Sequence, residues 1–159
     1  MHVCVLMGSP RLHGNTAELS KPFVRELKEQ GASVDYVTLA DKRIAPCRGC
    51  YACQRVSGEY GCVQKDDMYD IIARIGAAEL FVLAAPIYTW YCPAEMKAML
   101  DRFYGVAKYY GTGEDSSWRG KRCALLLTHG YDRAYACDPF ELGVRRLCEH
   151  YKMVYEGLY

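Results

Sequence analysis

Five short runs of strand character, separated by segments with helical periodicity, limit this chain to a small set of folds. The first and third runs are continuous and apolar, as expected of strands buried on both faces of a sheet. The runs are HVCVLM (2–7), SVDYVTL (33–39), ELFVLAAP (79–86), KRCALLLTHG (121–130) and MVYEGLY (153–159). Strand and helix alternate along the chain, and this order implies a parallel sheet covered by helices on both faces.

Helical patterns fill the gaps between these runs. We expect one helix that ends near Gln30, one that begins at 66–67, one over 93–107 and one over 138–151. Pro22 counts against the first helix, because an interior proline costs about 3 kcal/mol or kinks the axis. In the last helix, Asp138 is expected as the cap and Pro139 as the first residue. The predicted fold is a three-layer α/β sandwich of the flavodoxin type, with strand order 2-1-3-4-5.

Size and charge restrict the classes of partner. A chain of 159 residues most simply makes one domain, here 1–159. The net charge is +1 and no basic run occurs, which argues against a nucleic-acid partner. No apolar stretch approaches the ~20 residues that a membrane helix needs. We expect a cytoplasmic protein, in which thiols stay reduced and the nine cysteines form no disulfide framework.

Ligands of such sheets bind at the carboxyl ends of the strands, near the switch point beside the first strand. The loop there, GSPRLHGNT (8–16), lacks the glycine pattern of dinucleotide sites and the G-K-[ST] of P-loops. Neutral donors, one arginine and the free N–H groups of a helix start suit a single terminal phosphate. The alternative is a polar turn in which Asn15 or Thr16 simply caps the helix. The residues expected at the phosphate are Ser9, Arg11, Gly14, Asn15 and Thr16.

Two further loops at the same edge of the sheet have features that a flat heterocycle needs. APIYTWYCP (85–93) offers aromatic side chains and a turn whose backbone N–H groups should be free of the sheet. THGYD (128–132) offers polar groups, and His129 is either a hydrogen-bonding partner of the ring or a surface histidine. The alternative is that the aromatic residues cover the sheet edge or a dimer contact. The residues expected at the ring are Pro86, Ile87, Tyr88, Thr89, Trp90, Thr128, His129 and Gly130.

Three segments together carry a family resemblance: GSPRLHGNT, CRGCYACQ…GCVQKDDM and APIYTWYCPAEMKAMLDRFY. The chain resembles the NAD(P)H-dependent FMN reductase and iron–sulfur flavoprotein group of flavodoxin-like proteins. The resemblance implies FMN as cofactor, with its phosphate on Ser9, Arg11, Asn15 and Thr16 and its ring against 86–89. It also implies NAD(P)H as co-substrate. The protein would form a homodimer or homotetramer in which helix 93–107 and the cysteine-rich segment 40–65, here called the cysteine loop, contact a neighbouring subunit.

The segment 40–65 is long, irregular and rich in cysteine, and loops of this length are usually functional. Cys47, Cys50, Cys53 and Cys62 are spaced C-x2-C-x2-C-x8-C. Three close cysteines with a remote fourth are common for a [4Fe–4S] cluster, whereas structural zinc usually takes two close pairs. A loop without a cluster, used for packing and assembly, is the alternative and is slightly favoured over the cluster. The remaining cysteines are expected to be apolar core residues.

A flavin would carry the chemistry itself, so no acid–base side chain is expected to be essential. NAD(P)H would deliver hydride to flavin N5, and electrons would pass to a small-molecule or protein acceptor. The alternatives are an iron–sulfur flavoprotein electron carrier that does not use NAD(P)H, and an inert FMN module. Away from this site, Lys97 and Lys108 are expected to be solvated, and the Asp101–Arg102 pair to stabilise its helix.

Overall fold

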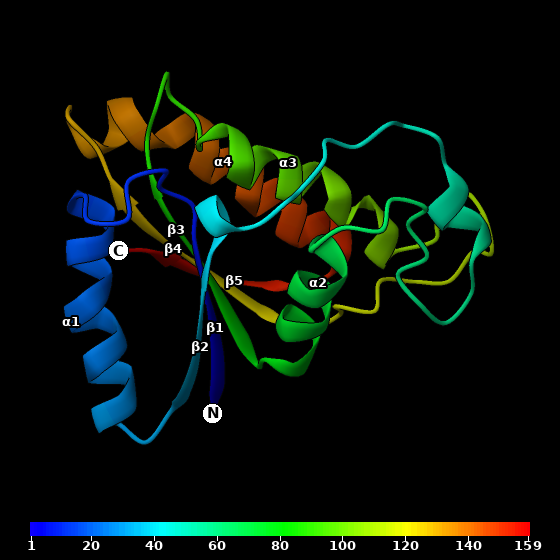
Figure 1. The fold of residues 1–159 in the computed structure, drawn as a ribbon, viewed down its shortest axis with the longest axis horizontal. Coiled ribbons are helices and arrows are strands. Elements are labelled where there is room, and N and C mark those ends of the chain that lie inside the picture. The colour runs from blue at the N-terminus through cyan, green and yellow to red at the C-terminus, as the bar shows by residue number, and fades with distance from the viewer.

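The computed structural model describes residues 1–159 as one five-stranded parallel sheet with the order β2-β1-β3-β4-β5 (Figure 1). The predicted fold class and strand order are therefore confirmed. The strands are β1 (His2–Met7), β2 (Ser33–Thr38), β3 (Leu80–Pro86), β4 (Arg122–Thr128) and β5 (Val154–Leu158). The α-helices are α1 (Asn15–Glu29), α2 (Met68–Ala77), α3 (Ala94–Arg102) and α4 (Arg133–Tyr151).

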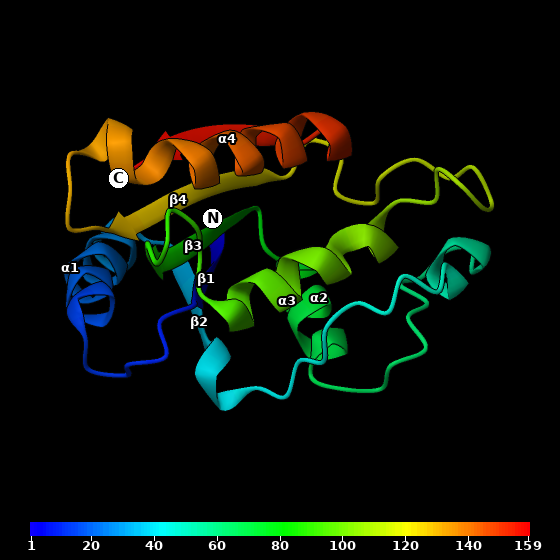
Figure 2. The same cartoon turned by 90° about the horizontal axis from the view of Figure 1, so that it is seen from above.

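The three central strands are apolar on both faces because each face packs against helices. Every residue of β3 is buried, and β1 is buried from Val3 to Met7. On one face, Phe23, Val24 and Leu27 of α1 cover the sheet. On the other face, the larger core gathers apolar side chains of α2, α3 and α4. Figures 1 and 2 show α1 on its own side of the strands, which accounts for the three-layer arrangement.

Two of the predicted helices differ in extent from the expectation. α4 begins at Arg133, five residues before Asp138, so the predicted cap is wrong and Pro139 lies inside the helix. The earlier start buries Ala136 and Cys137 on the same stripe as Phe140, which offsets the backbone hydrogen bond that the proline lacks. α1 likewise continues through Pro22. None of these helices is both long enough and apolar enough to cross a membrane.

The helix expected over 93–107 is α-helical only to Arg102 and continues as a 3-10 turn, η3 (Phe103–Val106). Gly105 lies in this turn, where a Cβ atom would stand 2.6 Å from the ring of Tyr60. The backbone of η3 thus packs directly on the cysteine loop. This contact is the first of several that join the loop to the end of α3.

The carboxyl ends of β1, β3 and β4 lie side by side, because Met7 is in register with Ala84, and Pro86 with Thr128. The loops that follow these strands gather at one end of the molecule's long axis. The cysteine loop projects at the opposite end, beyond α2 and the end of α3 (Figures 1 and 2). The chain therefore separates its two chemically distinctive regions.

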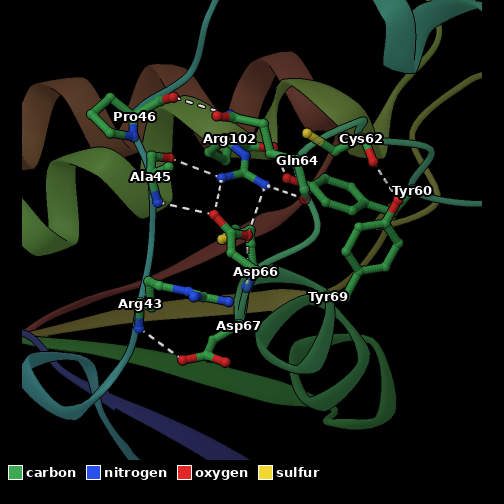
Figure 3. Close-up of polar contacts among 11 residues, drawn as sticks. Arg43, Ala45, Pro46, Tyr60, Cys62, Gln64, Asp66, Asp67, Tyr69 and Arg102 are labelled. Atoms are coloured by element: carbon green, nitrogen blue, oxygen red, sulfur yellow. Dashed lines mark hydrogen bonds and ion pairs between the residues drawn. The ribbon is translucent and has the colours of Figure 1, made fainter.

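Arg102 anchors the cysteine loop from both sides (Figure 3). Its guanidinium donates to the carbonyls of Ala45, before the cysteines, and Gln64, after them. It also forms a two-point ion pair with Asp66, at 2.8 and 3.0 Å, with side-chain exposures of only 1% and 6%. Burial raises the pKa of Asp66, but hydrogen bonds from Arg102 and the Ala45 N–H outweigh it and hold that pKa below its ordinary value.

The expected role of the Asp101–Arg102 pair is thus half wrong. Asp101 pairs with Lys97 on the helix surface, as a helix-stabilising charge does. Arg102 points the other way and closes the base of the loop instead.

We predict that Arg102→Met lowers the free energy of unfolding by about 3–5 kcal/mol, because it leaves the Asp66 carboxylate buried without its partner. Urea unfolding followed by circular dichroism measures the loss. Lys97→Met is the matched control, since its exposed pair with Asp101 contributes at most about 1 kcal/mol. Equal losses in the two variants would contradict the anchoring role.

Candidate functional site

The loop after β1 presents unpartnered donors at the start of α1. Gly14 precedes the helix and supplies no side-chain cap, so the N–H groups of the first turn remain free to bind a ligand. Neither Asn15 nor Thr16 acts as the simple cap of the alternative interpretation. Ser9 is buried, and its hydroxyl accepts a hydrogen bond from the Arg11 N–H at 3.1 Å. The loop thus lies at the positive end of the α1 dipole, beside free N–H groups that favour an anion.

Thr16 joins this loop to the loop after β4. Its hydroxyl lies 2.7 Å from that of Thr128, although Thr16 is itself almost fully buried. Two loops that are 112 residues apart are held together in this way.

The three predicted loops line one hollow of about 210 Å³. Its walls are formed by Ser9, Arg11, Asn15, Thr16, Pro86, Ile87, Tyr88, Thr128, His129 and Gly130. An adjoining hollow of about 230 Å³ shares Ile87, His129 and Gly130 and adds Thr89 and Trp90. Of the predicted residues only Gly14 lines neither, and it serves as the residue before α1. A larger hollow of about 770 Å³ lies along α1 and contains none of the predicted residues.

The turn after β3 has an unusual backbone. Tyr88 and Tyr91 exchange two backbone hydrogen bonds, at 2.9 and 3.0 Å, and close a tight reversal. Thr89 and Trp90 between them have positive φ angles of 50° and 61°. This conformation is costly for a non-glycine residue, and most of all for a β-branched one. Neither residue's N–H has an acceptor in the chain, so the turn offers the free donors that the sequence predicted.

An aromatic group flanks this turn. Trp90 meets Tyr135 edge to face at 5.7 Å, and Tyr135 meets Tyr131 at 5.6 Å. All three side chains are exposed, at 40% for Trp90. His129 lies beside them with Nδ1 2.7 Å from the Tyr131 carbonyl, which fixes its ring at the rim of the hollow.

The residues present fit FMN. Free helix N–H groups, two hydroxyls and Arg11 suit a terminal phosphate. The free donors of the 88–91 turn and the apolar wall of Ile87 suit the polar edge and the flat face of a heterocycle.

The cysteine loop separates the nine cysteines into two classes. The five outside the loop are buried, as predicted. Cys47 and Cys50 are exposed, and Cys53 and Cys62 half-buried. Burial raises the pKa of the Cys53 thiol. Nowhere does the structure gather three or more His, Cys, Asp or Glu side chains as metal ligands. The donor set fits a thiolate-bound metal centre, but the loop holds it in an open arrangement.

Lys108 and Gln54 are residues that the sequence analysis missed or misjudged. The expectation that Lys108 is solvated is wrong, because it is 4% exposed. Its Nζ donates to the carbonyls of Cys53, Tyr60 and Gly105, at 2.7, 3.2 and 2.7 Å. Gln54 is also buried and donates to the Tyr104 and Ala107 carbonyls. No motif marks these two residues, since their acceptors are backbone atoms of distant segments.

The backbone of the 88–91 turn yields a prediction. Thr89→Asn should raise the free energy of unfolding by about 0.5–1 kcal/mol, because asparagine tolerates positive φ better than threonine. Urea titration measures the gain. Thr112→Asn is the control, as an exposed threonine without a positive φ. A gain that Thr112→Asn matches, or no gain, would show that the turn holds no strain.

Comparisons with known proteins agree with this geometry. The family described as NADPH-dependent FMN reductase matches residues 1–137. An iron-sulfur flavoprotein of Archaeoglobus fulgidus is 35% identical over 157 residues, which cover 87% of this chain and 70% of that protein. An iron-sulfur flavoprotein of Methanosarcina thermophila is 34% identical over 102 residues, 64% of this chain and 52% of its own length. The chain thus spans about half the length of some curated relatives and more of others.

Solved structures share the fold. An NAD(P)H:quinone oxidoreductase from Methanothermobacter marburgensis superposes with a TM-score of 0.71 at 24% identity, covering 99% of this chain and 82% of that one. An FMN-dependent NADH-azoreductase from Bacillus anthracis gives a TM-score of 0.71 at 14% identity, covering 99% and 85%. With the family match over most of its length and a relative at 35% identity, the chain belongs to the NADPH-dependent FMN reductase family.

Proposed function

We propose that this chain is an FMN-dependent oxidoreductase that takes hydride from NAD(P)H and passes electrons to a small-molecule or protein acceptor. One observation carries the proposal: loops from three strands converge on a hollow whose donors suit a phosphate at one end and a flat ring at the other. Membership of the reductase family supports the same conclusion.

Each loop has a separate task. The phosphate is bound by the first N–H groups of α1 and by the side chains of Ser9, Arg11, Asn15 and Thr16. Pro86 and Ile87 provide an apolar wall, and the turn at 88–90 provides backbone donors for the ring's polar edge. Thr128, His129 and Gly130 close the opposite side. When bound, FMN supplies hydride acceptance and electron transfer at its N5 position.

The chain's side chains position and shield the ring and transfer no proton in the reductive step. Trp90, Tyr131 and Tyr135 are exposed beside the hollow. We propose a homodimer or homotetramer in which a neighbouring subunit covers these aromatic groups and completes the nucleotide site.

Stopped-flow mixing of the FMN-loaded protein with NADPH, and separately with NADH, tests the function. Bleaching of the visible flavin absorbance within seconds is expected for at least one nucleotide, because hydride transfer from the nucleotide reduces the flavin. No bleaching by either nucleotide within minutes would remove the reductase function.

The phosphate loop yields its own prediction. Arg11→Met should raise the Kd for FMN about ten- to a hundredfold, because a hydrogen bond from a charged donor contributes about 1.5–3 kcal/mol. Quenching of flavin fluorescence measures the affinity. Arg25→Met, on the exposed side of α1, is the matched control and should leave it unchanged. A loss that the two variants share would place the phosphate elsewhere.

A second candidate function is supported by the cysteine loop. In it, Cys47, Cys50, Cys53 and Cys62 hold a [4Fe–4S] cluster, and the protein is an electron carrier that does not use NAD(P)H directly. The spacing, the exposure of Cys47 and Cys50 and the names of the curated relatives favour it. Iron and acid-labile sulfide in anaerobically purified protein test it. Less than about one iron per chain would exclude it, since a cubane holds four.

A further inference from the structure

Lys108 is a buried cation without a partner anion. Three carbonyl oxygens lie within 3.2 Å of its Nζ atom. Burial lowers the pKa of Lys108, but a neutral amine has only two N–H bonds, so the three hydrogen bonds that Nζ donates fit the charged ammonium form. No carboxylate lies within 4.0 Å, and Glu59 and Glu114 act on it only from longer range. Buried charges in proteins are ordinarily paired with an opposite charge, and Lys108 has no such partner in the chain.

Arg102 shows what ordinary pairing looks like in the same region. It too ties the cysteine loop to the end of α3, but the carboxylate of Asp66 neutralises it at 2.8 Å. The loop is therefore fixed by one neutralised cation and one uncompensated cation. Holding the loop in place does not require the charge of Lys108. The neutral amide of Gln54 already links the loop to the segment 104–107 by hydrogen bonds.

The uncompensated charge lies against the backbone of the cysteine loop. One of the three carbonyls belongs to Cys53, and another belongs to Tyr60, two residues before Cys62. The 2.7 Å hydrogen bond to the Cys53 carbonyl places the ammonium next to a residue of the proposed centre. A metal cluster held by four thiolates is a net anion, and one-electron reduction makes it more negative without forming or breaking a bond. Such a centre is the missing partner for the ammonium.

We infer that Lys108 is the built-in counter-charge of an anionic thiolate centre on Cys47, Cys50, Cys53 and Cys62, and that it raises the reduction potential of that centre. The inference rests on the cluster of the second candidate function. Lys108 acts through the field it places on the centre and through the Cys53 backbone, so it is a positioning residue rather than a ligand.

The test compares Lys108→Met with Gln54→Leu after anaerobic reconstitution with iron and sulfide. Each variant removes hydrogen bonds that hold the cysteine loop in place, but only Lys108→Met also removes a charge. Iron and sulfide per chain are measured first. The midpoint potential of the cluster is then measured by titration with dithionite and redox mediators, dithionite being the electron donor. Thermal unfolding of the iron-free proteins measures the stability lost with these hydrogen bonds alone.

We expect both iron-free variants to lose stability, and only Lys108→Met to show a more negative midpoint potential than the wild type. Loss of the cluster from Lys108→Met but not from Gln54→Leu would equally support the counter-charge. Three outcomes would overturn the counter-charge: equal potentials in wild type and Lys108→Met, equal shifts in both variants, or loss of the cluster from both. Lys108 would then only hold the loop in place. A wild-type protein without iron would overturn the cluster and the counter-charge together, whereas the FMN site has its own test.

Discussion

The burial of parallel strands on both faces is the constraint on which the rest of this structure depends. A strand that is apolar on both sides can present chemistry only where it ends. Met7, Pro86 and Thr128 end three neighbouring strands at one edge, so the loops that follow them must meet there. Helices that return the chain to the other edge then add their N-termini to the same place. The hollow between these loops is thus a consequence of how the core is packed.

This dependence explains why so much of the fold, and the meeting of the three loops at one hollow, could be predicted from sequence. Apolar runs identify the strands, and their order identifies the edge. Polar residues at or just after the end of a run, such as Ser9 and Thr128, can therefore be assigned to that edge of the sheet before any contact is known. Helix ends were less predictable: Pro139 and Asp138 indicate a start by local propensity, but burial of Ala136 and Cys137 moves the start back to Arg133. Tertiary packing outweighed the local signal there.

The cysteine loop could be predicted far less well, because long-range contacts of polar groups hold it in place. Arg102 and Lys108 look like surface residues by composition, since lysine and arginine are rarely buried unless paired. Their partners are carbonyls at positions 45, 53, 60, 64 and 105, together with one carboxylate at position 66, and nothing in a sequence ties a side chain to such acceptors. The four cysteines could be recognised by spacing, whereas their surroundings could not.

The two ends of the molecule each depart from an ordinary rule of protein structure. At one end Thr89 and Trp90 adopt positive φ angles, and at the other Lys108 is buried without an anion. Conflicts of this kind persist when the surrounding structure over-determines them, and they concentrate at functional sites. α3 connects the two ends, beginning three residues after Tyr91 and ending at Arg102, over about 13 Å of helix. One rigid element therefore fixes the separation between the flavin turn and the base of the cysteine loop.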